Sequence, residues 1–272
     1  MKQKKVNIKG RDIFYYESRD NGHPVVFVHG MSSSASIFIR QIIDSALSYR
    51  YRFIAMDLPG YGNSEMSDNP ENDYTISGLS NFLVNFCAEL KLENAVYVGH
   101  NTGANIILES FEKLKKPLGL ALLAAIPFSN PVTYEMFLKK SFFETFSKPG
   151  MDDSEVHQFA ALLVEENTKY PDFIPEIIRK ADLKTREFLF KSIVNGEYTD
   201  QINIIKDLKV PVAVYFGELD QIINFDYLNS IDFPTIWRSK IQIINDSGHM
   251  FFYESPADFN VSFEGYLNTV FK

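Results

Sequence analysis

The sequence contains almost no cysteine. Among its 272 residues there is one, Cys87, and a single thiol excludes an internal disulfide. Cys87 falls within a stretch of helical spacing, where we expect it to be a small buried hydrophobic residue. The absence of disulfides is typical of proteins that fold in a reducing compartment, and we expect a soluble cytoplasmic protein.

Long apolar runs and an excess of basic charge are also absent. No run approaches the roughly 20 apolar residues that span a bilayer, and the basic start of the chain has no apolar stretch after it, which argues against a secretion signal. The net charge is −8 and the isoelectric point is near 5.2. An acidic surface repels phosphate groups, so nucleic acid and membrane surfaces are excluded as expected partners. A small molecule is the expected partner, bound by a monomer or a small homo-oligomer.

The sequence also lacks the patterns that hold metals and dinucleotides. His23, His100 and His157 show no paired spacing for a metal. Gly60-Tyr61-Gly62 is not followed by the third glycine of a dinucleotide fingerprint. We therefore expect no metal and no organic cofactor.

Apolar residues make up 45% of the chain, which is enough for a full core. Short apolar runs alternate with segments of helical spacing, a pattern typical of βαβ units and a parallel sheet. The predicted strands are Lys5–Ile8, Ile13–Tyr16, Val25–Val28, Phe53–Met56, Ala95–Val98, Leu118–Leu123, Val212–Phe216 and Ile241–Ile244. The predicted helices are Ile37–Leu47, Ile76–Leu90, Gly103–Phe111 and a last one with Ser255 as N-cap and Pro256 at its first position.

The alternation stops between the sixth and seventh predicted strands. That stretch predicts several helices and no clear strand, so we divide the chain into a core of residues 1–127 and 207–272 and a helical lid of residues 128–206. A lid there would cover the carboxyl ends of the strands, where such sheets bind ligands. The stretch is rich in aromatic residues: Phe128, Tyr134, Phe137, Phe142, Phe143, Phe146, Phe159, Tyr170, Phe173, Phe188 and Phe190.

The strongest functional signal is the run from Tyr97 to Asn105, in which a buried strand, a Gly99-His-Asn-Thr-Gly103 turn and a helix follow one another. Such a turn alone is common. Four further motifs, each at a strand end, accompany it in order: His29-Gly30-Met31, Asp57-Leu-Pro-Gly-Tyr-Gly-Asn-Ser64, Gly217-Glu-Leu-Asp220 and Gly248-His249. Together they resemble the α/β-hydrolase fold, whose nucleophile elbow, acid and histidine follow in this order.

The resemblance implies an α/β-hydrolase fold, with a mostly parallel central sheet flanked by helices and a helical lid after the sixth strand. It puts Asn101 at the nucleophile position, with His249 as base and Asp220 as the acid that orients it. It also implies an oxyanion hole made by the backbone N–H groups of Met31 and Thr102. The residues implied to lie against the substrate are His29, Gly30, Ser32 and His100.

Asn101 is the main departure from that family. Asn tolerates the positive φ of the elbow, but its neutral carboxamide cannot attack as a serine would. Thr102 is no substitute, since its side chain is expected to point away. Three explanations stay open: Asn stands where an active parent has Ser, or where it has Asp, or the natural protein binds ligands without reacting. We favour a serine parent and expect the Asn101 form to be nearly inactive.

The loop Val28–Phe38 and the run Asp246–Phe259 resemble those of the α/β-hydrolase-type N-acyl-homoserine lactone hydrolases, which implies lactone hydrolysis and quorum quenching. Two positions depart from that family, which has Asn where this chain has Met31 and Glu where it has Asp220. The aromatic lid suits an apolar acyl chain or is simply lid core. An aspartate parent would indicate a haloalkane dehalogenase or an epoxide hydrolase. Dehalogenases place Trp after the nucleophile, and the single Trp here is Trp237.

Overall fold

The computed structural model describes residues 2–43, 45–133, 136 and 150–272. An eight-stranded sheet in the order β1-β2-β4-β3-β5-β6-β7-β8 forms its centre. The β1–β2 and β2–β4 pairs are antiparallel and the other pairs are parallel, so the predicted mostly parallel sheet is confirmed. The strands are β1 (Lys2–Ile8), β2 (Arg11–Glu17), β3 (His23–Val28), β4 (Tyr51–Met56), β5 (Val96–His100), β6 (Gly119–Leu123), β7 (Val212–Gly217) and β8 (Gln242–Ile244).

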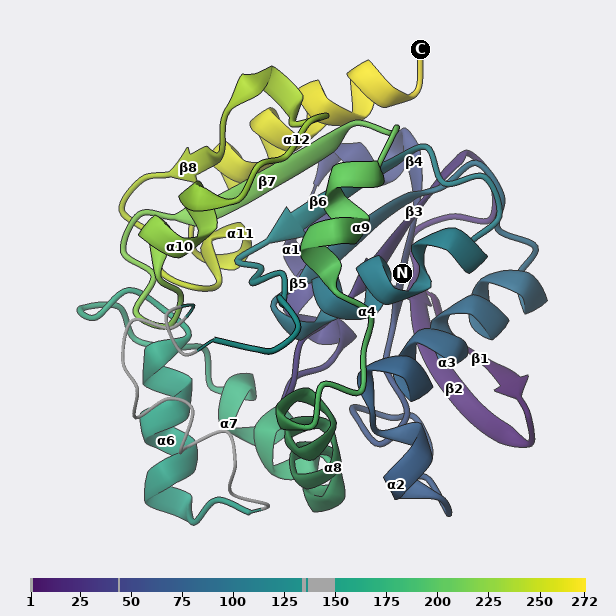
Figure 1. Ribbon diagram of the computed structural model, residues 1–272, viewed down its shortest axis with the longest axis vertical. Coiled ribbons are helices and arrows are strands. Elements are labelled where there is room, and N and C mark those ends of the chain that lie inside the picture. The colour runs from purple at the N-terminus through teal and green to yellow at the C-terminus, as the bar shows by residue number, and fades with distance from the viewer. Residues whose placement is uncertain (1, 44, 134–135, 137–149) are drawn as a thin grey trace.

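Helices cover both faces of the sheet, which explains why its central strands are continuous apolar runs rather than alternating ones. Every residue of β5, β6 and β7 is buried. Figure 1 shows α3, α4 and α9 in front of the sheet and α12 behind it. The longer helices of the core are α3 (Ile76–Glu89), α4 (Thr102–Ser110), α9 (Gln201–Asp207) and α12 (Pro256–Val270), and the shorter ones are α1 (Ile39–Ile42), α2 (Pro70–Asp73), α10 (Phe225–Ser230) and α11 (Phe251–Glu254). None of the helices within the described ranges is long and apolar enough to cross a bilayer.

One local prediction was wrong, and a second, Ser255 as N-cap with Pro256 at the first helical position, was confirmed in position but not in its side-chain bond. The helix predicted over Ile37–Leu47 is broken into η1 (Ala35–Phe38), α1 and η2 (Ala46–Tyr49). Ser45 starts the last piece, because its side chain accepts the Leu47 N–H. Ser255 stands before α12 but caps no N–H group of the helix, since its hydroxyl is paired with that of Ser247 at 2.7 Å.

Three helices of the predicted lid lie together below the sheet in Figure 1: α6 (Asp153–Leu162), α7 (Phe173–Lys180) and α8 (Leu183–Val194). The capping box of Asp152 and Glu155 starts α6. By contrast α9, at the end of the predicted lid, packs against α4 of the core, so the boundary at residue 206 stays a prediction. Five of the lid aromatics lie outside the described residues: Tyr134, Phe137, Phe142, Phe143 and Phe146.

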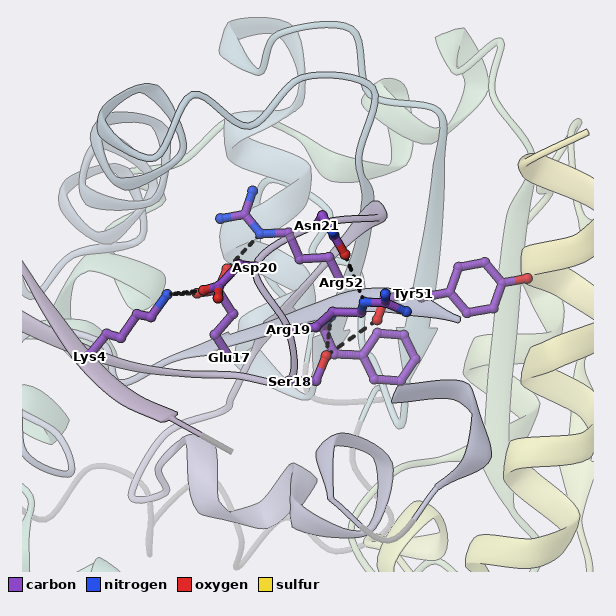
Figure 2. Close-up of polar contacts among 9 residues, drawn as sticks. Lys4, Glu17, Ser18, Arg19, Asp20, Asn21, Tyr51 and Arg52 are labelled. Carbon is purple, nitrogen blue, oxygen red and sulfur yellow. Dashed lines mark hydrogen bonds and ion pairs between the residues drawn. The ribbon is translucent and has the colours of Figure 1, made fainter. Parts of the chain in front are cut away.

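An ionic cluster joins the N-terminal hairpin to the parallel part of the sheet (Figure 2). The Glu17 carboxylate, whose side chain is 1% exposed, accepts from Lys4 Nζ at 2.5 Å and from Arg52 Nε at 2.6 Å. The next residue, Ser18, accepts the Phe53 N–H at 3.0 Å. A carboxylate removed from water needs such partners, because unpaired burial of its charge is costly.

The substitution Glu17→Gln tests this cluster. We expect it to lower the free energy of unfolding by about 2 kcal/mol or more, because Lys4 and Arg52 lose a buried counter-charge. Urea denaturation measures the change. The matched control is Lys5→Gln, which breaks the exposed Lys5–Asp12 pair and should change stability little. Equal effects of the two substitutions would contradict a structural role for Glu17.

Candidate active site

The elbow between β5 and α4 has the geometry predicted from its glycines. Asn101 has φ 51° and ψ −123°, in the positive-φ region that Asn tolerates better than most residues. A Cβ on Gly103 would lie 2.1 Å from the Val28 carbonyl oxygen, and one on Gly99 would lie 2.5 Å from the Ala104 nitrogen. Only glycine permits this close approach of helix, turn and strand, so the Asn101 side chain is held at the end of the sheet.

Asn101, His249 and Asp220 form a continuous hydrogen-bonded chain. His249 Nδ1 donates to Asp220 Oδ2 at 2.8 Å, and Asn101 Nδ2 donates to His249 Nε2 at 3.1 Å. Both His249 and Asp220 are buried. The other carboxylate oxygen of Asp220 accepts the N–H groups of Ile222 and Ile223. The structure therefore brings together three residues that lie far apart in the sequence, in the order that orients a general base.

The Asn101 carboxamide also binds the N–H group assigned to the oxyanion hole. Its Oδ1 accepts from Thr102 N at 2.7 Å and from Thr102 Oγ1 at 2.8 Å. The expectation that the Thr102 side chain points away was wrong, because the amide oxygen offers its hydroxyl an acceptor. In this form a ligand oxygen would have to displace Oδ1 to reach the Thr102 N–H.

His29 supports the loop after β3 from beneath. Its Nδ1 donates to the Gly30 carbonyl at 2.7 Å and its Nε2 accepts the Leu58 N–H at 3.0 Å. Burial lowers the pKa of His29 to about 4, so the ring is neutral at pH 7. With both nitrogens bonded to backbone, the side chain fixes the loop, and this corrects the expectation that it contacts substrate.

The Asp57–Ser64 turn fixes the same loop from its other end. Asp57 accepts the Ala35 N–H at 2.8 Å and the Asn63 N–H at 2.9 Å. Gly62 has positive φ, and a Cβ there would lie 2.3 Å from the Asp57 carboxylate. The motif therefore acts by holding backbone in place.

Of the other residues predicted to contact the substrate, Gly30 and His100 line a cavity beside His249 and Ser32 does not. His100 Nε2 donates to the His249 carbonyl at 3.3 Å, and burial lowers the pKa of His100 well below its usual value. Ser32 is buried with φ 53°, and its hydroxyl accepts from Arg186 Nη1 at 3.3 Å.

Two cavities meet at Asn101. The larger is lined by Met31, Asn101 and Thr102 among others. Its walls are mostly apolar, with Ile126, Phe128, Val132, Leu189, Phe190 and Ile193 among them. The smaller is lined by His249, Met31 and Phe159 among others. Apolar walls with a few polar groups are typical of sites that bind small molecules.

Sequence reasoning missed the residues that fasten the lid to the site. Glu254 accepts the N–H of Glu165 in the lid at 2.7 Å and that of Gly248 at 3.0 Å, and burial raises the pKa of its carboxyl. Gln221, next to Asp220, donates to the Val164 carbonyl at 3.0 Å. No motif marks the contacts with Glu165 and Val164, because these partners are backbone groups distant in sequence.

Comparison with known proteins decides the family. The family model described as "Alpha/beta hydrolase family" matches residues 25–261. The chain belongs to the α/β-hydrolase family. The predicted fold class is thereby confirmed.

Relatives at moderate identity span nearly the whole α/β-hydrolase chain. The AB hydrolase superfamily protein YisY of Bacillus subtilis (strain 168) is 26% identical over 275 residues, covering 90% of this chain and 92% of YisY. The 2-hydroxy-6-oxo-6-(2'-aminophenyl)hexa-2,4-dienoic acid hydrolase of Metapseudomonas resinovorans is 26% identical over 268 residues, covering 93% and 87%.

Among solved structures, the N-acyl homoserine lactonase AidH complexed with N-butanoyl homoserine superposes with a TM-score of 0.92. The match covers 98% of this chain and 96% of AidH at 23% identity. At this identity the likeness shows a shared fold.

Buried neutral His29 predicts how the stability of this α/β-hydrolase depends on pH. The pKa of His in an unfolded chain is near 6.5, whereas burial lowers the pKa of folded His29 to about 4. Between these two pH values the unfolded chain therefore binds a proton that the folded chain does not. The contribution of His29 to the free energy of unfolding is therefore fully present above pH ~6.5 and is lost as the pH falls toward its folded pKa. In His29→Gln the loss of unfolding free energy between pH ~7 and pH ~5 should be smaller by about 2 kcal/mol.

Urea denaturation of both forms at the two pH values measures this difference. His100 contributes in the same direction in both proteins, so its effect cancels in the comparison. An equal loss in the two forms would show that His29 becomes protonated without unfolding.

Proposed function

We propose that the protein has a hydrolase-type site for carboxylic esters or lactones with an apolar acyl chain, of the N-acyl-homoserine lactone kind. The observation that carries the proposal is the Asp220–His249–Asn101 chain, whose Asn101 lines a mostly apolar cavity. With Asn101 the protein binds such ligands and turns them over at most slowly. With serine at position 101 it is an active enzyme.

The reaction follows from the positions of these groups. A serine hydroxyl at position 101 would give its proton to His249 Nε2 and attack the carbonyl carbon of the ligand. Asp220 would stabilise the imidazolium through the bond to Nδ1. The Thr102 N–H, freed from the amide oxygen, and the Met31 N–H would bind the oxyanion. His249 would then return the proton to the leaving alcohol, and water would release the acid.

The cavity supports an acyl substrate rather than a small polar one. Ile126, which follows β6, lines the same cavity as Leu189 and Ile193 of α8. The shared fold with AidH, a lactonase by its name, supports a lactone as the reacting group. Degradation of acyl-homoserine lactone signals would be the resulting role.

A ligand-binding protein without turnover is the second candidate. Asn101 favours it, because its carboxamide ties up both the Thr102 N–H and His249 Nε2. The intact His249–Asp220 pair favours the enzyme, since binding alone requires no oriented base. An aspartate parent acting on alkyl halides or epoxides is the third, and the variants below separate all three.

Asn101→Ser should create esterase activity. We expect the rate to rise by about 10³-fold or more over the Asn101 form, since loss of one member of such a triad removes most of the catalysis. Hydrolysis of p-nitrophenyl butyrate and of acyl-homoserine lactones measures it.

The double variant Asn101→Ser with His249→Gln is the matched control and should return to the level of the Asn101 form. Asn101→Asp should act on a haloalkane or an epoxide only if a carboxylate is the proper nucleophile. If neither the Ser nor the Asp variant turns over any of these while ligands still bind, the enzyme proposal fails and the binding protein replaces it.

The affinity of the Asn101 form should rise with the length of the acyl chain. Each methylene that enters the cavity is expected to contribute about 0.8 kcal/mol, or roughly fourfold in Kd. Calorimetry with a homologous series of acyl-homoserine lactones measures it. Ile193→Ser, in the cavity wall, should flatten the dependence, whereas Val194→Ser, at an exposed neighbour, should not. A Kd independent of chain length would remove the acyl pocket from the proposal.

A further inference from the structure

The Asn101 carboxamide is held as a substrate of this kind of site would be held. Its carbonyl oxygen accepts two hydrogen bonds, from Thr102 N at 2.7 Å and from Thr102 Oγ1 at 2.8 Å. Two donors on one oxygen draw electrons from the carbonyl carbon and would stabilise the oxyanion that forms when a nucleophile adds there. The side chain thus occupies the position that the oxygen of a bound ester would take.

The nitrogen of the same carboxamide lies against the acid–base pair. Nδ2 is 3.1 Å from His249 Nε2, within the distance over which a positioned base and acid transfers a proton. His249 is itself oriented by Asp220 at 2.8 Å. An amide whose nitrogen faces a general acid has a leaving group that can depart as ammonia.

The Asn101 side chain lines two cavities that could hold water. Asn101 is half-buried and lines both cavities, the larger on the Thr102 side and the smaller on the His249 side. The smaller cavity is lined by both His249 and Asn101. A water there would have its base and its target within one enclosure.

We propose that the site hydrolyses its own Asn101, so that the protein matures to a form with aspartate at position 101. This inference does not depend on the ester or lactone proposed above, because the reacting amide belongs to the chain itself. In this reaction His249, Asp220 and the donors of Thr102 would have a function that requires no serine at position 101.

The reaction balances with water as the only co-reactant. His249 Nε2 takes a proton from water while the water oxygen bonds to Cγ, and the carbonyl electron pair moves to Oδ1, held by Thr102. His249 then gives the proton to Nδ2, the C–N bond breaks with its electron pair on nitrogen, and ammonia leaves. The products are ammonia and the carboxylic acid of an aspartate side chain at position 101. A carboxylate at the elbow is a nucleophile of the kind used in covalent hydrolase mechanisms.

This route differs from ordinary deamidation, in which the next backbone nitrogen attacks the side chain and a succinimide forms. Here the Thr102 N–H points at Oδ1 and Thr102 begins α4, so its nitrogen is not free to attack. Direct hydrolysis yields aspartate alone, whereas a succinimide opens to both aspartate and isoaspartate.

Peptide mass spectrometry on the intact, folded protein tests the proposal. The protein is incubated at neutral pH for increasing times, digested, and fragmented by electron transfer to separate aspartate from isoaspartate. Asn21 and Asn195, exposed and each followed by glycine, serve as internal controls for the succinimide route. Asn101 should convert to aspartate without isoaspartate, while the two controls yield both.

Two variants separate the site from background chemistry. His249→Gln and Asp220→Asn should each slow conversion at Asn101 by about 10²-fold or more, the contribution of a positioned general base, and leave Asn21 and Asn195 unchanged. Circular dichroism checks that each variant is folded, and either folded variant suffices. The proposal is overturned if Asn101 stays an amide while the controls convert, if isoaspartate appears at position 101, or if the folded variants convert as fast as the parent. Because no added substrate is involved, failure of the ester or lactone proposal would leave this result unaffected.

Discussion

The site depends on the close packing of strand β3, the elbow and the start of α4. The contact between Gly103 and the Val28 carbonyl leaves no space for a side chain, and it forces the turn in which Asn101 takes positive φ. A sharp reversal of this kind costs backbone strain, which persists because the buried strands on either side fix both ends. All other groups of the site are placed relative to this turn, since it sets where the side chain at position 101 points.

Asn101 changes what that geometry does. A serine there would leave the Thr102 N–H for the ligand and use His249 as its base. The carboxamide instead satisfies both groups at once, accepting from Thr102 and donating to His249. A buried polar group left without a partner is costly, so an amide at this position is a stable arrangement in which the reactive groups are bonded to one another. The same bonds hold the amide as a substrate would be held. They therefore keep the site from reacting with a ligand and at the same time prepare the Asn101 side chain for the slow hydrolysis proposed above.

The segment predicted to be the lid is hydrogen-bonded to the loops of the site. Its segment Leu163–Glu165 bonds to the histidine loop through Met250 and Glu254 and to the acid loop through Gln221. A Cβ on Gly248 would lie 2.5 Å from Val164 and Glu165 backbone atoms. The backbone of this segment therefore helps to position the loops that carry His249 and Asp220.

Local features of the sequence were enough to predict the sheet, the order of its strands along the chain, and the positions of Asn101, Asp220 and His249. Apolar runs that end in glycine or histidine motifs are local, and a parallel sheet brings the ends of its strands to one edge. The positive φ of Asn101 was predictable for the same reason, since two glycines around a strand–helix turn restrict the backbone.

The remaining features emerged only in the folded chain, because they depend on partners distant in the sequence. His29 occurs in a motif typical of substrate contact, yet the Leu58 N–H makes it a loop support. The Thr102 hydroxyl turns toward Asn101 because the amide oxygen is there to accept it. Glu254, Gln221 and Arg186 carry no sequence signal, since each acts through a backbone group or a hydroxyl that only the fold brings near.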